Sequence, residues 1–212
     1  MKTLVYLVRH GESLGNFEKR FLGHADLPLT DKGRTQAACL TAYLEKNAVK
    51  PDAVYARSLS RAFETARIAT GKEPISTPNM REICGGAWEG VELSVIRERY
   101  PEDLRLFNED IGVSRPTGGE SVAELSERIL KTVFAIAEEN AGKTVLIGTH
   151  ATPVRLVETF ARGLSVEGAA SVPWPTNASL SAYLVGDGEV LPLFYSLDSY
   201  LGDLVTRVPR RL

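Results

Sequence analysis

The chain has 212 residues, a formal net charge of −2 and a charged fraction of 25%, which is the size and charge balance of one ordinary globular domain. Its charge gives no sign of the basic surface that binds nucleic acid, and no stretch approaches the roughly 20 apolar residues that span a membrane. We therefore expect neither a nucleic acid nor a membrane as a partner. The apolar run at residues 4–8 is too short for a signal-peptide core. Cys39 and Cys84 lack metal-ligand or redox spacing, so a cytoplasmic protein with reduced thiols is expected.

The first half of the chain alternates between short strands and helices. Residues 4–8 are continuously apolar with β-branched and aromatic members, which predicts a buried strand. Thr30 then opens a predicted helix with one inward face, formed by Ala37, Leu40, Thr41 and Leu44. Residues 52–56 predict a second strand. Ser58 is the expected N-cap of the next helix, which ends at Gly71.

The second half continues the alternation. Residues 121–124 have the Ser-x-x-Glu spacing of a capping box, and the apolar residues behind them recur at steps of three and four. This pattern predicts a long helix that ends near residue 142. Residues 143–150 predict another buried strand, which is followed by a helix that ends at Gly163. Residues 178–197 predict two strands around the turn Gly186-Asp187-Gly188.

This order of elements predicts an α/β fold. We expect a mostly parallel central sheet with helices on both faces and some antiparallel pairing late in the chain. Residues 81–117 are rich in Arg, Glu and Gly, and they predict a helical insertion, or cap, over one end of the sheet. Because no repeat or low-complexity linker interrupts the chain, we expect a single domain over residues 1–212.

Two of the three histidines directly follow predicted buried strands. His10 comes after the first strand and His150 at the end of a later one. Ligands of open α/β sheets bind at the carboxyl ends of the strands, so the two histidines are expected at one edge of the sheet. A single histidine in such a place is more often a turn residue than a catalyst. The repetition makes the two interpretations about equal.

Two arginines are expected near the same edge. Arg9 precedes His10, and Arg61 lies in the first turn after the second strand. Guanidinium groups match the oxygens of phosphate, and a neutral imidazole attacks phosphorus when its other nitrogen is held protonated by an acceptor. These residues predict an anion pocket with phosphate as its guest. The three histidines, His10, His24 and His150, lack metal-ligand spacing, so metal binding is the weaker interpretation.

Six segments carry a resemblance to a known family. In chain order they are LVRHGES with the later Asn16, RFLGHADLPLTDKGRTQA, ARSLSRAFETA, REICGGAWEG, GGES and VLIGTH. Together they resemble the histidine phosphatase superfamily, the phosphoglycerate-mutase-like group with the RHG signature. The resemblance implies a three-layer α/β/α fold and a phosphohistidine intermediate, without a metal or an organic cofactor.

The resemblance also implies a role for each matching residue. His10 would be the nucleophile, and Glu82 the general acid that protonates the leaving oxygen and then activates water. Without the family match, Glu82 reads as a solvated glutamate. The implied catalytic set is His10, Glu82, Arg9, Arg61 and His150. The implied phosphate-binding set is Arg9, His10, Asn16, Gly23, Arg61, Glu82, His150 and Ala151.

Other residues near these motifs have smaller expected roles. Ser58 is expected to cap its helix rather than to bind phosphate, and Gly11 to let the backbone approach the anion. Glu12 is expected to orient neighbours or to form a salt bridge, and His24 to lie at the pocket rim. Ala151 stands where the family usually has glycine, so its methyl group is expected beside the phosphate, where it shades substrate choice.

The reaction depends on what accepts the phosphoryl group. A mutase must hold a bisphosphate and exclude water, and the glycolytic mutases of the family generally have longer chains. The short chain and its Trp-Glu-Gly segment favour a metal-independent phosphatase of the histidine acid type, acting on a small phosphorylated metabolite. The alternatives are a 2,3-bisphosphoglycerate-dependent phosphoglycerate mutase and a non-catalytic phosphate-ligand-binding protein. A homodimer is left open.

The remaining arginines bear on the substrate. Those of the insertion are expected mostly on a solvated helix face, with one or two pointing inward to a charged substrate. They are Arg97, Arg99, Arg105 and Arg115. The chain end carries Arg207, Arg210 and Arg211, which are expected to form a frayed basic terminus, with closure over the pocket as the alternative.

Overall fold

The computed structural model describes residues 1–57 and 60–206. Ser58, the expected helix cap, and the arginines at 207, 210 and 211 lie outside the described residues. The strands are β1 (Thr3–Arg9), β2 (Ala53–Ala56), β3 (Ile75–Ser76), β4 (Thr144–Thr149), β5 (Leu180–Gly186) and β6 (Glu189–Leu197). The α-helices are α1 (Leu14–Phe17), α2 (Asp31–Lys46), α3 (Ser60–Thr70), α4 (Leu93–Arg99), α5 (Pro101–Glu109), α6 (Val122–Glu139) and α7 (Ala151–Ala161).

The six strands form one sheet in the order β3-β2-β4-β1-β5-β6. The pairs β1–β4, β2–β4 and β2–β3 are parallel, whereas β5 runs antiparallel to both β1 and β6. The sheet is therefore mostly parallel with antiparallel pairing late in the chain, which confirms the prediction. The hairpin between β5 and β6 turns at Asp187 and Gly188, whose φ angles are 56° and 76°.

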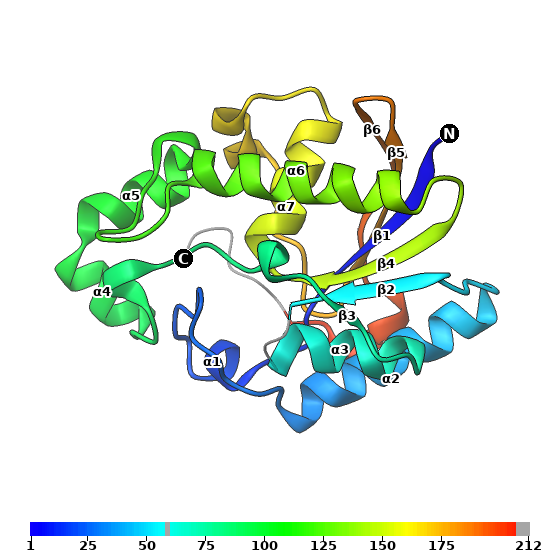
Figure 1. Ribbon diagram of the computed structural model, residues 1–212. Coiled ribbons are helices and arrows are strands. Elements are labelled where there is room, and N and C mark those ends of the chain that lie inside the picture. Colours follow the sequence, from blue (N-terminus) through cyan, green and yellow to red (C-terminus); the bar gives the residue numbers. More distant parts are fainter. Residues whose placement is uncertain (58–59, 207–212) are drawn as a thin grey trace.

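Helices cover both faces of the sheet, which gives three layers. In Figure 1, α2 and α3 lie below the strands, and α6 and α7 lie above them. Alternate residues of each strand face opposite layers, so two cores form. The core under α2 and α3 includes Val8, Leu40, Leu44, Val54, Ala66 and Leu146. The core under α6 and α7 includes Val5, Leu7, Leu125, Ile129, Val133, Val145 and Ile147.

The helix starts follow the signals in the sequence. The Thr30 hydroxyl accepts a hydrogen bond from the Gly33 N–H and caps α2. Ser121 and Glu124 form the predicted capping box at the start of α6, where each side chain bonds the other residue's backbone N–H. These bonds satisfy N–H groups that have no partner inside the helix.

The helices α4 and α5 lie beyond the end of the sheet that is opposite the N-terminus (Figure 1). A buried aromatic cluster attaches this region to the loop after α1, with the centroid of the Phe21 ring 5.2 Å from that of Trp88 and 5.9 Å from that of Phe107. Two backbone hydrogen bonds add to this contact, from the Phe21 N–H to Val91 and from the Gly90 N–H to Phe21. These contacts join residues near position 21 to residues near positions 88 and 107, and the joined segments stand beside the ends of the strands.

Two short elements were not predicted. The strand β3 has only two residues, both exposed, and therefore carries no hydrophobic pattern. The single-turn helix α1 is set by a local capping box between Ser13 and Asn16. Within the described ranges, no helix combines the length and apolar character that crossing a bilayer requires.

Candidate active site

The carboxyl ends of β1 and β4 lie side by side at one edge of the sheet. The two strands are in register, with Arg9 opposite Thr149. The His10 N–H donates to the Thr149 carbonyl at 3.0 Å. As a result, the rings of His10 and His150 lie edge to face, 5.2 Å apart between their centroids. The prediction that these histidines share one edge of the sheet is confirmed.

His10 is held in one tautomer by its own turn. Its Nδ1 lies 2.7 Å from the Gly11 carbonyl oxygen, which only accepts hydrogen bonds, so Nδ1 carries the proton and Nε2 keeps its lone pair. The His10 carbonyl accepts from the Ala178 N–H and from Asn177 Nδ2, both at 3.1 Å. Burial, and after it the nearby arginine charges, lowers the His10 pKa well below its ordinary value. A neutral imidazole with a free Nε2 can act as a nucleophile.

His150 is only 1% exposed, and neither of its ring nitrogens has a hydrogen-bond partner among the described residues. Burial first, and then the charges of Arg61 and His10, lower the His150 pKa well below its ordinary value. The residue is the N-cap of α7, where a helix presents its positive end. Leaving buried polar atoms without partners costs free energy, so this ring is available to a ligand.

Two arginines present buried guanidinium groups that main-chain carbonyls hold in place. Arg9 Nη1 donates to Pro175 at 2.6 Å. Arg61 donates from Nη1 to Ala25 at 2.7 Å and from Nη2 to Gly23 at 3.0 Å. Both Nε atoms are buried without a partner in the described part of the chain. Burial lowers the pKa of Arg9 to about 10, which leaves it cationic at neutral pH, and burial also lowers the pKa of Arg61.

Glu82 is half-buried, and backbone N–H groups fix its carboxylate. Oε1 accepts from the Ile83 N–H at 2.9 Å, and Oε2 accepts from the Thr152 N–H in the first turn of α7 at 3.2 Å. Its charge raises the pKa of both Arg9 and Arg61, partly offsetting burial. The carboxyl group therefore lies within electrostatic reach of the two arginines.

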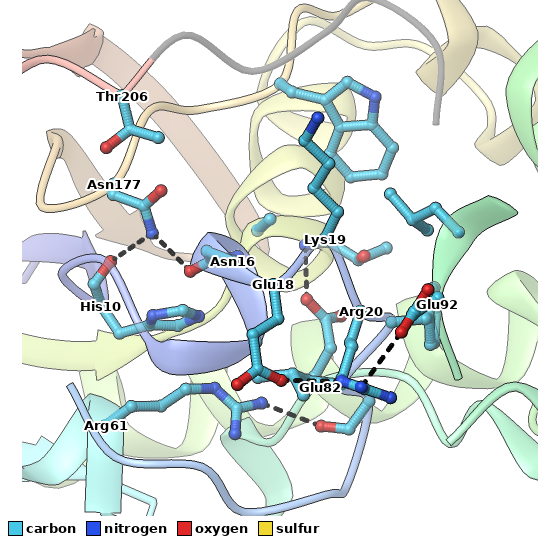
Figure 2. A pocket seen from close by; sticks show the side chains of 18 of the residues that line it. His10, Asn16, Glu18, Lys19, Arg20, Arg61, Glu82, Glu92, Asn177 and Thr206 are labelled. Carbon is cyan, nitrogen blue, oxygen red and sulfur yellow. Dashed lines mark hydrogen bonds and ion pairs between the residues drawn. The ribbon is translucent and has the colours of Figure 1, made fainter. Parts of the chain in front are cut away.

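Asn16 has its amide oxygen fully occupied. Asn16 Oδ1 accepts from the backbone N–H and the hydroxyl of Ser13, at 3.2 Å and 3.0 Å, and from Asn177 Nδ2 at 3.1 Å. Figure 2 shows Asn177 linking Asn16 to His10. Three donors to one oxygen identify it as the carbonyl end of the amide, so the Nδ2 end is the donor available to a ligand.

A cavity of about 710 Å³ opens at this edge of the sheet, within the range of about 300–1,000 Å³ that is typical of small-molecule sites. Seven of the eight residues in the predicted phosphate-binding set line it, namely Arg9, His10, Asn16, Gly23, Arg61, Glu82 and Ala151. The eighth, His150, is not among the lining residues and meets the site through the His10 ring. Ala151, which stands where the family usually has glycine, is one of these lining residues.

Three other residues near the site have contacts that the sequence only partly indicated. His24 does not line the cavity, and its Nε2 lies 3.1 Å from the Glu82 carbonyl. Gly11 packs against the Gly33 backbone, so its missing side chain serves the contact with α2 rather than approach to an anion. Glu12 forms the expected salt bridge, with its Oε2 3.5 Å from Lys32 Nζ.

The sequence did not indicate several residues of the site. Asn177 precedes β5, and because β5 is antiparallel to β1 its start lies at the same edge as the ends of the parallel strands. A search for polar residues before antiparallel strands would have found it. Glu89 accepts N–H groups of His24, Ala25 and Gly85, and so holds the loop whose carbonyls orient Arg61. Only the folded structure reveals that link.

The outer part of the cavity is built mainly from the loop after α1 and from the insertion. Its lining residues include Glu18, Lys19, Arg20, Glu92, Leu93, Arg97, Phe107 and Trp174. Arg97 is thus the insertion arginine that faces the cavity, whereas Arg105 pairs with Glu102 at the surface. In the described ranges, no three or more His, Cys, Asp and Glu side chains gather in a way that could hold a metal ion.

Comparisons with known proteins agree with this geometry. Residues 5–195 match the model of the histidine phosphatase superfamily (branch 1). The chain is 30% identical to phosphoserine phosphatase 1 of Hydrogenobacter thermophilus, with 93% of each chain covered. It is 28% identical to a 2,3-bisphosphoglycerate-dependent phosphoglycerate mutase of Rhizobium etli, over 90% of this chain and 95% of that one.

Among solved structures, YhfR of Bacillus stearothermophilus superposes with a TM-score of 0.87 at 32% identity, covering 94% of this chain and 99% of that one. The match to the family model covers most of the chain and spans β1 to β6. This protein therefore belongs to the histidine phosphatase superfamily, branch 1.

Proposed function

We propose that this protein is a metal-independent phosphomonoester hydrolase that acts on a small phosphorylated metabolite through a phosphohistidine on His10. One observation carries the proposal. The His10 Nδ1 proton is fixed on the Gly11 carbonyl, and the neutral ring lines the same cavity as two buried arginines whose Nε atoms have no described partner. A buried cationic pocket with an uncharged nucleophile fits a phosphate dianion.

The first step transfers the phosphoryl group to the enzyme. His10 Nε2 attacks phosphorus as the bond from phosphorus to the substrate's ester oxygen breaks, and Glu82 gives its proton to that oxygen, which leaves as an alcohol. Arg9, Arg61 and the Asn16 amide donate to the non-bridging oxygens and hold them in line. The neutral His150 ring packs against the His10 ring and does not itself line the cavity. Its low pKa limits charge repulsion with the arginines.

The second step returns the enzyme to its starting state. Water attacks phosphorus, the Glu82 carboxylate accepts a water proton, and the bond from phosphorus to Nε2 breaks to release inorganic phosphate. His10 is again neutral, with its proton on Nδ1. The same carboxyl group thus acts as acid in the first step and as base in the second.

Hydrolysis of p-nitrophenyl phosphate in the presence of a chelator tests this proposal. We expect phosphate release by the wild type that survives chelation and is lost in His10→Ala. Release that disappears with the chelator would contradict the metal-independent mechanism. A wild type that binds phosphate but releases none would favour a binding protein.

Mutase activity is the second candidate, because a relative named as a phosphoglycerate mutase matches this chain as well as the relative named as a phosphatase does. The two activities are separated by supplying 3-phosphoglycerate with and without 2,3-bisphosphoglycerate and measuring free phosphate and isomer. The hydrolase proposal expects phosphate as the main product. Rapid isomerisation with negligible phosphate release would make the chain a mutase.

A further inference from the structure

Glu82 follows a single 3-10 turn, Pro78–Met80, and side chains satisfy the carbonyls of residues 79 to 82 one after another. Thr149 Oγ1 donates to the Met80 carbonyl at 2.6 Å. Arg128, from the middle of α6, donates to the carbonyls of Asn79, Arg81 and Glu82 at 2.6, 3.2 and 3.3 Å. The Arg128 guanidinium therefore donates hydrogen bonds to three of the four main-chain carbonyls of residues 79–82.

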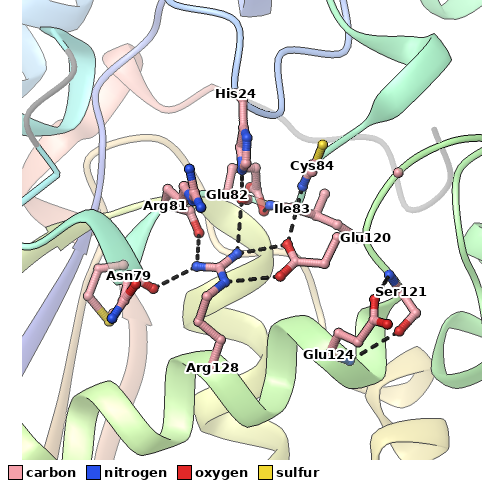
Figure 3. Close-up of polar contacts among 12 residues, drawn as sticks. His24, Asn79, Arg81, Glu82, Ile83, Cys84, Glu120, Ser121, Glu124 and Arg128 are labelled. Atoms are coloured by element: carbon pink, nitrogen blue, oxygen red, sulfur yellow. Dashed lines mark hydrogen bonds and ion pairs between the residues drawn. The ribbon is translucent and has the colours of Figure 1, made fainter.

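The Arg128 side chain is itself held by a carboxylate. Arg128 Nε and Nη2 donate to Glu120 Oε1 and Oε2 at 3.0 Å and 2.8 Å, a two-point pairing that fixes the plane of the guanidinium. Both side chains are only 17% exposed. Glu120 also accepts the Cys84 N–H at 3.3 Å, so the pair reaches the backbone on both sides of Glu82 (Figure 3).

On this geometry we propose that Arg128, braced by Glu120, is a positioning residue that aims the Glu82 carboxyl group at the leaving oxygen. The inference rests on the proposed function, in which Glu82 is the general acid. Arg128 is not among the residues that line the cavity, and it acts on the main chain that carries Glu82. Proton transfer requires the acid within hydrogen-bonding reach of the leaving oxygen, so a small displacement of the backbone weakens it.

A positioning role predicts a dependence on the leaving group. An alkoxide is a poor leaving group and needs the proton from Glu82, whereas p-nitrophenolate leaves as a stable anion and needs it little. The informative quantity is therefore the ratio of kcat/KM for an alkyl phosphate, such as glycerol 3-phosphate, to kcat/KM for p-nitrophenyl phosphate. Loss of folded protein alone lowers both values equally and leaves the ratio unchanged.

Arg128→Lys is the main variant, because it keeps the charge but loses the planar fork that bonds the carbonyls and Glu120 together. We expect the ratio to fall by about 10- to 100-fold, a part of the roughly 10²- to 10⁴-fold that a general acid contributes. Glu120→Gln removes the charged brace and is expected to lower the ratio in the same direction by less.

Arg115→Lys is the matched control. Arg115 also bonds one carbonyl, that of Gly119, and one carboxylate, that of Glu124, but within the described residues it forms no hydrogen bond to the Glu82 segment. Its replacement is expected to leave the ratio unchanged. A second control places Arg128→Lys in a Glu82→Gln background, where the ratio should no longer respond because the acid is already absent.

The outcomes separate this inference from the proposed function. If the wild type hydrolyses neither substrate, or Glu82→Gln lowers both equally, the proposed function or its general acid is wrong. If Glu82→Gln lowers the ratio but Arg128→Lys lowers both substrates equally, or Arg128→Lys still lowers the ratio in the Glu82→Gln background, Arg128 is not a positioning residue. A fall of the ratio in Arg128→Lys that is absent from Arg115→Lys supports it.

Discussion

The inner and outer halves of the cavity are built in different ways. The inner half consists of Arg9, His10, Arg61, Glu82 and the adjacent His150. Main-chain groups orient four of these five side chains, and all but Glu82 are almost fully buried. In the outer half, Arg20 pairs with Glu18 at 2.7 Å and with Glu92 at 3.2 Å, and all three side chains are between 34 and 50% exposed (Figure 2).

Under the proposed function, this difference assigns the chemistry to the inner half and the choice of substrate to the outer half. Main-chain anchors place the inner groups to within the tolerance that bond making requires, and burial strengthens their electrostatic effect. Ion pairs between exposed side chains contribute little to stability and rearrange easily. We therefore expect substitutions in the inner half to change the rate for every substrate, and those in the outer half to change the choice among substrates.

The largest expected effect concerns the two buried imidazoles of the inner half. Only His10 has its Nδ1 proton fixed by a carbonyl, so only His10 should carry the phosphoryl group. Rapid acid-free quenching and peptide mass spectrometry should find phosphohistidine at position 10 in the wild type and in His150→Asn, and none in His10→Asn. Phosphorylation at position 150 in any of these proteins would reverse the assignment of roles.

Arg61→Lys should have the next largest effect. Lysine cannot donate to the carbonyls of Gly23 and Ala25 while also presenting a planar fork to phosphate, so we expect kcat/KM to fall by about 10²-fold for all substrates. Vanadate inhibition should weaken in parallel. The control is Arg67→Lys, an exposed arginine on the same helix, which should leave both unchanged. Similar losses in the two variants would indicate damage to α3 rather than to the phosphate site.

The two buried histidines of the inner half should make the folded protein less stable at mildly acidic pH than at neutral pH. The pKa values of His10 and His150 lie well below 6.5 in the folded state, so the unfolded chain binds more protons once the pH falls under about 6.5. The free energy of unfolding should therefore fall between pH 7 and pH 5.5, before the carboxylates titrate. Urea titrations at each pH measure it, and His150→Gln should reduce the slope. A slope that is flat or reversed in the wild type would contradict the burial of neutral imidazoles.

The smallest effect is expected in the outer half. Lys19 and Arg97 line the cavity and, within the described residues, form no ion pair, so they can attract an anionic group on the leaving alcohol. Arg97→Ala should lower kcat/KM for phosphoserine relative to phosphoethanolamine, which lacks the carboxylate, by about 3-fold, the value of one exposed charge contact. Arg99→Ala, which removes an exposed arginine that does not line the cavity, should leave this ratio unchanged. If Arg97→Ala lowers kcat/KM equally for both substrates, Arg97 does not contribute to the choice between them.

Much of this architecture was accessible from local patterns. The first strand is a continuous apolar run at residues 4–8, and the later strand has an apolar centre at residues 145–147. The capping signals at Thr30 and Ser121 lie where the helices begin. His10 and His150 each follow a strand of a parallel sheet, and the ends of such strands lie at one edge. The sequence therefore predicts that the two histidines lie together, as they do. Glu82 was identified only through the family resemblance, since its local sequence is that of an ordinary surface loop.

The hydrogen bonds that hold the site residues in place could not be predicted from local sequence patterns. Arg128 and Glu82 are far apart in the sequence, and the pattern of α6 places Arg128 merely beside its apolar stripe. Asn177, Glu89 and the carbonyl of Pro175 act through hydrogen bonds across loops, for which no periodicity exists.

The sequence by itself determined the order of the longer strands and helices along the chain, the edge of the sheet that carries the two histidines, and the cationic character of the pocket. These follow from hydrophobic periodicity and from the rule that parallel strands end together. Only the tertiary structure decided which ring nitrogen of His10 carries the proton, which hydrogen bonds hold Glu82, and which arginine of the insertion faces the cavity. Those properties depend on hydrogen bonds and packing between segments that meet only when the chain is folded.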